Sequence, residues 1–212
     1  MVKGNRREIG VSIVSGNEPL ILASASPARA ALLHGAGLDF ETRPSHVDET
    51  ELKITKKLEG AENVALALAE LKAAHIAAKM PGKLVIGADQ LLDCGGDWLD
   101  KARDRQDARR QLKLLRGRAH HLATAVCVMR GSSVLWCYVG APRLQMRDFS
   151  DEFVEHYLNA AAGEAYGCVG AYRLEGLGAQ LFDKIEGDYF TILGLPLLPL
   201  LGFLRSRGLL VS

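Results

Sequence analysis

A serine-rich turn between an apolar run and a helical pattern holds the first residues with binding chemistry. Ser24, Ser26 and Arg29 lie in LILASASPARAALL, residues 20–33, where Pro27 takes the position that opens a helix. The N-terminus of a helix attracts anions, so hydroxyls, backbone N–H groups and a guanidinium placed there can bind phosphate. The other interpretation is a capped turn in which Arg29 lies on the solvated face of the helix.

A carboxylate inside an apolar run is the second candidate. Asp89 lies in LVIGADQLL, residues 84–92, and Gln90 follows it. Because an unpaired buried charge is costly, an acid at the end of a buried strand is expected to be paired, bound to a metal or placed at the mouth of a cleft. A carboxylate in such a place can activate water or hold a metal ion. The alternative is a structural acid that caps a turn.

The third candidate, Glu175, stands directly before a Gly-x-Gly turn in YRLEGLG, residues 172–178, where a backbone can approach a ligand closely. Taken alone, this stretch also fits an ordinary hairpin or loop turn. Lys72 lies in a helical pattern and Lys101 follows a predicted hairpin, and both are cations of the kind that neutralise phosphates. A lone lysine is more often a solvated surface residue.

Strand and helix patterns alternate along the chain, and the α/β fold that they predict must position these residues. Apolar runs predict strands at residues 20–23, 84–86, 121–129, 134–139 and 180–185. Helical spacing and stop signals predict helices at residues 27–36, 62–79, 108–115, 151–161 and 196–204. No repeat or linker divides the chain, so one domain is expected.

Composition narrows the classes of function. With 48% hydrophobic and 24% charged residues, the chain can bury a sizeable core. A net charge of +1 gives no general attraction to nucleic acid or to an anionic membrane, so polyphosphate binding requires a local cluster of cations. The four cysteines lack metal-type spacing and are expected to be reduced. The apolar stretch near the N-terminus is too short for a signal or a membrane span, which predicts a cytoplasmic protein.

Ordered sequence blocks resemble the Maf family of nucleoside triphosphate pyrophosphatases. The blocks are residues 20–33, VDET at 47–50, ELKAAHIA at 70–77, VIGADQ at 85–90, LDKARD at 99–104, YRLEGLGAQLFDKIEGDYF at 172–190 and LGLPL at 193–197. Residues 1–19 lie outside the resemblance and are interpreted as an N-terminal extension, and residues 20–212 as a single Maf-like domain. The resemblance implies a Maf/ITPase-like (Ham1-like) fold, in which helices flank a mixed, twisted sheet with a substrate cleft.

The resemblance also implies an activity and roles for single residues. It implies hydrolysis of a nucleoside triphosphate to the monophosphate and pyrophosphate, with Asp89 as the catalytic base or metal-linked acid. A divalent cation, magnesium, manganese or cobalt, is the implied cofactor, and Glu49 and Asp89 are its implied ligands. The implied phosphate-binding residues are Ser24, Ser26, Arg29, Lys72 and Lys101. The family further implies a homodimer.

Three departures from the usual Maf pattern resemble the branch that acts on 7-methyl-GTP. Ala28 replaces an arginine, Gln90 a threonine and Glu175 a glutamine. These residues are expected to shape the base pocket, where Glu175 would accept hydrogen bonds from guanine and favour the positive charge of a methylated ring. Ala28 cannot stack on the base as the large residue often found in that branch can. Because of the resemblance at these three positions, the predicted substrate is 7-methyl-GTP or a related modified nucleotide.

Two alternatives stay open. Other members of the family prefer dTTP and UTP, and a glutamine at position 175 would suit a pyrimidine edge. The family was also linked to septum formation, which is compatible with a nucleotide-binding regulator that has little catalytic activity. Tight triphosphate binding without product over hours would favour the regulator.

Overall fold

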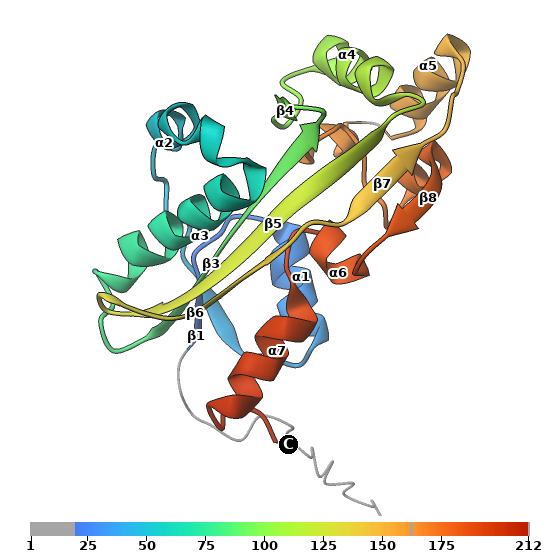
Figure 1. Cartoon of the computed structure of the whole chain (residues 1–212). Coiled ribbons are helices and arrows are strands. Elements are labelled where there is room, and N and C mark those ends of the chain that lie inside the picture. Colours follow the sequence, from blue (N-terminus) through green and yellow to red (C-terminus); the bar gives the residue numbers. More distant parts are fainter. Residues whose placement is uncertain (1–19, 162, 212) are drawn as a thin grey trace, which may run out of the picture.

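Helices flank a mixed sheet in the computed structural model, which describes residues 20–161 and 163–211 (Figure 1). The predicted N-terminal extension lies outside the described residues. The strands are β1 (Leu20–Leu22), β2 (Phe40–Thr42), β3 (Leu84–Cys94), β4 (Asp97–Leu99), β5 (Ala119–Arg130), β6 (Ser133–Gly140), β7 (Arg143–Met146) and β8 (Phe182–Glu186). None of the described helices is long and apolar enough to cross a membrane.

Several of the described α-helices begin at a residue whose side chain caps them. The α-helices are α1 (Pro27–Gly35), α2 (Thr50–Thr55), α3 (Ala61–Ala77), α4 (Arg105–Leu115), α5 (Asp151–Ala160), α6 (Tyr189–Ile192) and α7 (Leu197–Ser206). Ser26, Asp104 and Ser150 cap α1, α4 and α5, because their side-chain oxygens accept from backbone N–H groups of the first turn. Short 3₁₀ turns are η1 (Lys57–Glu59), η2 (Glu164–Gly167) and η3 (Leu177–Leu181).

One edge of the central strand β3 is only partly covered. The sheet runs β2-β1-β3-β5-β7-β8, with β4 on β3 and β6 on β5. β5 pairs antiparallel with residues 85–93 of β3. On the opposite edge, β1 pairs in parallel with residues 84–86 and β4 pairs antiparallel with residues 92–94. Among the described strands, none lies beside residues 87–91 on that edge, and this gap in the sheet contains Asp89 and Gln90.

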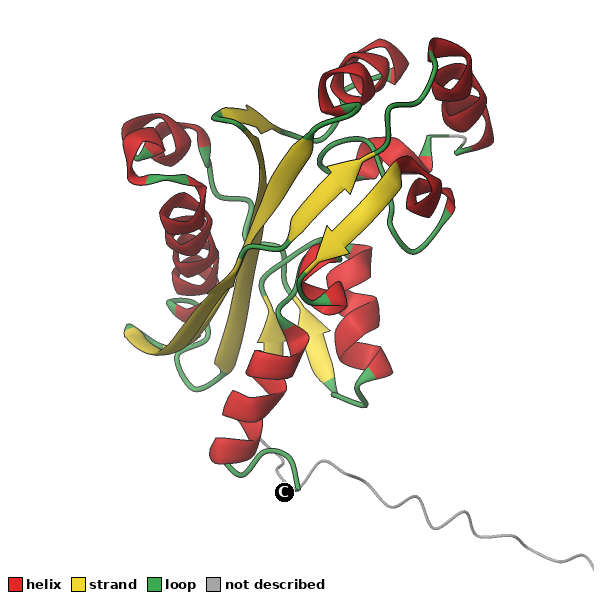
Figure 2. Ribbon diagram, turned by 45° about the vertical axis from the view of Figure 1, so that its right-hand side comes forward, coloured by secondary structure: helices red, strands yellow, loops and turns green. Residues whose placement is uncertain are grey.

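Three apolar clusters hold the layers together. On one face of the sheet, α3 packs on β1, β3 and β5. On the opposite face, α1 and α7 pack on the same strands, and Figure 2 shows these helices on either side of the sheet. Farther along β3 and β5, α4 and α5 pack on β7 and on the ends of the long strands. β3 contributes Ala88, which lies in the gap, to the second cluster and Leu92, directly after the gap, to the third. The gap therefore adjoins both clusters.

α3 lies against the backbone of β3 because Gly87 has no side chain. A Cβ atom on Gly87 would lie 2.2 Å from the carbonyl oxygen of Ala69 and 2.7 Å from the backbone nitrogen of Ala73. The alanines of α3 on this side are fully buried, as the alanine-rich helical pattern predicts. This close approach sets the distance between the helix and the strand from which Lys72 and Asp89 project.

Each predicted strand and helix is present in the structure, but some bounds differ, such as the start of α4 at Arg105 instead of residue 108, and some short elements were not predicted. β3 extends to Cys94, well beyond the predicted 84–86, because pairing with β5 continues through the polar residues at the gap. The short strands β2, β4 and β7 and the short helices α2 and α6 lie outside the strand and helix ranges predicted from the pattern. Residues 180–181, predicted as strand, belong to η3, and β8 begins at Phe182.

A methyl group at Gly87 should destabilise the protein. Gly87→Ala forces α3 away from β3, and we expect a loss of about 1–3 kcal/mol in the free energy of unfolding, measured by urea denaturation. Gly202→Ala is the matched control, because Gly202 lies in α7 with open space around its missing Cβ. That substitution should stabilise by about 0.5–1 kcal/mol. Equal effects of the two substitutions would contradict the close approach.

Candidate active site

The gap in the sheet opens into a cavity of about 540 Å³. Because β1 ends at Leu22 while β3 continues, the turn that follows β1 faces the uncovered part of β3. The walls also include α2, α3, the loop at residues 167–175 and the turn between α6 and α7. All predicted site residues line this cavity: Ser24, Ser26, Ala28, Arg29, Glu49, Lys72, Asp89, Gln90, Lys101 and Glu175. The fold therefore brings them together from six separate segments.

A chain of alternating charges runs from the floor of the cavity to its rim. Asp89 pairs with Lys72, whose ammonium lies 2.7 Å from Oε1 of Glu49. Oε2 of Glu49 lies 3.4 Å from the ammonium of Lys53, which lies 2.8 Å from Oδ1 of Asp100. The side chain of Asp89 is 8% exposed and that of Asp100 is 78% exposed, so this series of ion pairs extends from the buried interior to the solvent.

Burial has the largest effect on the pKa of Asp89, the acid at the floor of the cavity. It raises the pKa of Asp89 above the ordinary value, against the opposing effect of Lys72 and Arg29. Burial also opposes the ionisation of Glu49, but Lys72 and Lys53 together hold the pKa of Glu49 below its ordinary value. Oδ2 of Asp89 is buried and has no hydrogen-bond partner among the described residues. This oxygen is an acceptor that a water molecule or a cation could satisfy.

Arg29 holds the floor of the cavity together. Its Nε donates to the carbonyl of Gly194 at 2.8 Å, and its Nη1 donates to the carbonyl of Ala88 at 2.9 Å and to Oγ of Ser24 at 3.1 Å. Burial lowers the pKa of this guanidinium. The interpretation that places Arg29 on a solvated helix face is wrong, because its side chain points into the cavity and binds the carbonyls of Ala88 and Gly194. Within the described residues, Nη2 takes part in none of these bonds and is the donor group left for a ligand.

The two serines complete this turn. Oγ of Ser26 caps α1 by accepting from the backbone N–H of Arg29, and Oγ of Ser24 accepts from the backbone N–H of Ser26. Both hydroxyl oxygens are thus engaged within the turn, while each hydroxyl proton keeps the capacity to donate. Their phosphate-binding role stays a prediction.

Gln90 contacts the segment that follows β8. Its Nε2 lies 2.8 Å from Oγ1 of Thr124, 3.2 Å from the carbonyl oxygen of Thr191 and 3.0 Å from that of Ile192. Together with Arg29, it binds three backbone carbonyls of residues 191–194. Gln90 therefore positions this wall of the cavity, and its expected part in base selection remains a prediction.

The remaining predicted residues lie around the mouth of the cavity. Oε1 of Glu175 accepts from Nε of Arg173 at 3.0 Å. The backbone of Lys101 forms a β-bridge with Val169, which holds the 167–175 loop beside Lys101. Ala28 lines the cavity from the first turn of α1.

Sequence reasoning missed Lys53, Asp100 and Arg173, which also line the cavity. Lys53 lies four residues after Glu49, a spacing that places both side chains on one face of a helix, so this signal was present in the sequence. The carbonyls of residues 191–194 carry no such signal, because every residue has the same backbone groups.

Comparison with known proteins adds independent findings. A family model described as Maf-like protein matches residues 19–207. A nucleoside triphosphate pyrophosphatase of Granulibacter bethesdensis is 56% identical over 191 residues, which cover 89% of this chain and 96% of that protein. A 7-methyl-GTP pyrophosphatase of Mesorhizobium japonicum is 48% identical over 193 residues, which cover 90% and 97%. A solved dITP/XTP pyrophosphatase of Mycobacterium abscessus, 16% identical, matches with a TM-score of 0.42 over 90% of this chain and 95% of that chain.

Loss of the Arg29 guanidinium should loosen the turn at residues 191–194. In Arg29→Met the carbonyls of Ala88 and Gly194 lose their donor, and hydrogen bonds to charged groups contribute roughly 1.5–3 kcal/mol each. We expect faster amide hydrogen exchange at residues 189–195, measured by mass spectrometry. Arg205→Met, at an exposed position on α7, is the control and should leave this exchange unchanged. Unchanged protection in Arg29→Met would show that the turn does not depend on the guanidinium.

Proposed function

Because this chain belongs to the Maf family, whose model matches residues 19–207, we propose that it hydrolyses 7-methyl-GTP, or a closely related modified nucleotide, to the monophosphate and pyrophosphate. It is a hydrolase acting on acid anhydrides, as are the curated relatives named nucleoside triphosphate pyrophosphatases. The preference for 7-methyl-GTP is the part that we propose. The relative named 7-methyl-GTP pyrophosphatase, which is 48% identical to this chain, supports it.

One observation supports the proposed chemistry above all others. Asp89 lies buried at the uncovered edge of β3, with Lys72 on one oxygen and Arg29 near by, inside a cavity that also contains Lys101. A nucleoside triphosphate carries several negative charges, so the cations suit its phosphates. A buried carboxylate with a raised pKa suits a base that must keep a transferred proton.

These placements support the following reaction. A water oxygen attacks the α-phosphorus, the water gives its proton to Oδ2 of Asp89, and the bond to the departing pyrophosphate breaks. Arg29, Lys72 and Lys101 stabilise the negative charge that moves toward the leaving group. Ser24 and Ser26 donate their hydroxyl protons to phosphate oxygens from the turn before α1.

Two carboxylates suit a divalent cation at this position. In this alternative role, Asp89 would use its unpartnered oxygen as a metal ligand instead of as the proton acceptor. Glu49, on the other side of Lys72, would be the second ligand, since magnesium and manganese prefer oxygen ligands. The described residues contain no group of three acidic, histidine or cysteine side chains that could hold a metal by themselves, so substrate oxygens would complete the coordination. Such a cation would polarise the phosphate and lower the pKa of the attacking water.

Glu175 is the proposed base-recognition residue. Its carboxylate lies at the mouth of the cavity and is oriented by Arg173, so it can accept two hydrogen bonds from the edge of guanine. A negative group also favours the positively charged N7-methylated ring over an unmodified base. Ala28 leaves space for the base because its side chain is small, and Gln90 positions the wall at residues 191–192.

Replacement of Asp89 by asparagine should nearly abolish the activity. Loss of a general base costs roughly 100- to 10,000-fold in rate, so we expect kcat for pyrophosphate release to fall at least about 100-fold. The assay uses 7-methyl-GTP, GTP, dTTP, UTP, CTP and ITP with magnesium or manganese.

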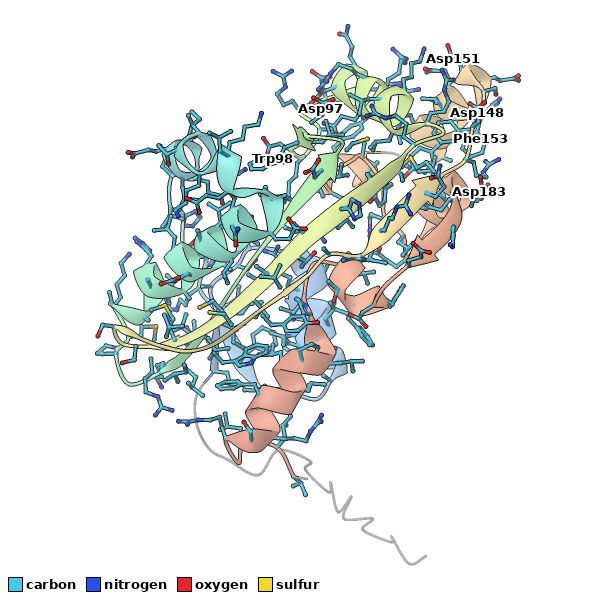
Figure 3. All side chains as sticks on the ribbon, in the orientation of Figure 1. Asp97, Trp98, Asp148, Asp151, Phe153 and Asp183 are labelled. Carbon is cyan, nitrogen blue, oxygen red and sulfur yellow. The ribbon has the colours of Figure 1, made fainter. Side chains whose placement is uncertain are left out.

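The matched control is Asp151→Asn. Asp151, on α5, pairs with Lys113 on α4 and with Arg116 directly after that helix, and it does not line the cavity. Figure 3 shows Asp151 on α5. That variant should retain wild-type turnover. Undiminished release by Asp89→Asn would overturn the mechanism, and tight triphosphate binding without any product in the wild type would favour the regulator instead.

Glu175→Gln should shift substrate preference toward pyrimidines. The amide removes one acceptor and the negative charge, so we expect the ratio of kcat/KM for 7-methyl-GTP to that for UTP to fall about tenfold or more. Glu186→Gln, which neutralises another ion-paired glutamate outside the cavity, should leave that ratio unchanged. An unaltered ratio in Glu175→Gln would show that Glu175 does not select the base.

A further inference from the structure

α2 brings one more cation to the mouth of the cavity. The ammonium of Lys53 lies between two carboxylates, 2.8 Å from Asp100 and 3.4 Å from Glu49. The side chain of Lys53 is 25% exposed and borders the same cavity as Asp89. The mechanism above uses neither Lys53 nor Asp100.

The two carboxylate partners of Lys53 differ in their other ion pairs and in their exposure to solvent. Glu49 also pairs with Lys72 and is half-buried, whereas Asp100 is 78% exposed and sits in the loop between β4 and α4, directly before Lys101. An exposed ion pair of this kind contributes only about 0–1 kcal/mol. The contact between Lys53 and Asp100 can therefore be exchanged at little cost for a stronger anion.

Contacts other than that ion pair also attach α2, because Leu52 packs against the apolar cluster of α3. Lys57, in the 3₁₀ turn after α2, places its ammonium 5.8 Å from the ring centroid of Trp98 on β4. Figure 3 shows Trp98 at the end of the sheet that faces α2. Lys53 thus projects from an anchored element and can change its anion without loss of the helix position.

We propose that Lys53 binds the terminal phosphates of the substrate, and that Asp100 is an internal competitor that occupies this lysine until the substrate arrives. The inference rests on the proposed function. Three ion pairs separate Lys53 from Asp89, in the direction of the rim, so Lys53 meets the end of the triphosphate that leaves as pyrophosphate. A triphosphate carries more charge than one carboxylate and displaces Asp100.

This arrangement predicts opposite effects from the two partners. Lys53→Met removes a phosphate ligand, so KM should rise about tenfold or more, with a smaller change in kcat. Asp100→Asn removes the competitor, so KM should fall about two- to fivefold. In the Lys53→Met background, Asp100→Asn should have no effect, because the lysine it would release is absent.

The test is a double-mutant cycle on the full-length protein. KM and kcat for pyrophosphate release are measured for the wild type, both single variants and the double variant. Lys56→Met is the matched control, because Lys56 follows the same helix but pairs with Glu59 outside the cavity, and its KM should match the wild type. Lys53→Arg keeps the charge and should keep KM within about threefold of the wild-type value.

Two results would overturn the inference. If Lys53→Met and Asp100→Asn change KM in the same direction, the pair only stabilises α2. If Lys53→Met changes KM no more than Lys56→Met does, Lys53 does not bind phosphate.

Calorimetry with inorganic tripolyphosphate separates this inference from the proposed function. If the wild type releases no pyrophosphate from any nucleotide, the proposed function fails, but weaker tripolyphosphate binding by Lys53→Met than by Lys56→Met would still support the lysine site. If the wild type is active and the two variants bind tripolyphosphate equally, only the lysine inference fails.

Discussion

The uncovered edge of β3 is the constraint on which the site depends. Interior strands normally have partners on both edges, and an interior edge without one leaves backbone groups that must find other partners. Here Arg29 binds the carbonyl of Ala88, and Lys72 pairs with the carboxylate that the same stretch carries. α3 can deliver Lys72 only because Gly87 lets the helix lie on the strand. The gap, the glycine and the two cations thus form one arrangement.

Charge in the cavity is arranged for exchange. The cations of the ion-paired chain already have carboxylate partners, so an arriving triphosphate replaces internal anions instead of meeting bare positive charge. This arrangement agrees with a net charge of only +1 for the whole chain. A bare cluster of cations would attract any polyanion, whereas a site that is already paired favours ligands with enough charge to displace its carboxylates.

Sequence reasoning selected residues that the fold brings into one cavity, because their side chains carry distinctive chemistry. A lone acid in an apolar run identified Asp89, and the serine-proline turn identified the segment that faces it. The length of β3 was missed, because polar residues at the gap interrupt the apolar pattern although pairing with β5 continues. Arg29 was predicted at the site, but its acceptors were not, since two of them are backbone carbonyls, which no residue type marks.

The bond between Arg29 and Gly194 also bears on how the chain is made. Its two partners are 165 residues apart, and the other clamp, from Gln90, also reaches residues 191–192. During translation, both side chains leave the ribosome long before the carbonyls that they bind, so water must satisfy them in the interval. This wall of the cavity is therefore assembled after most of the sheet has been synthesised. A growing chain has no complete cavity until the turn at Gly194 has emerged from the ribosome.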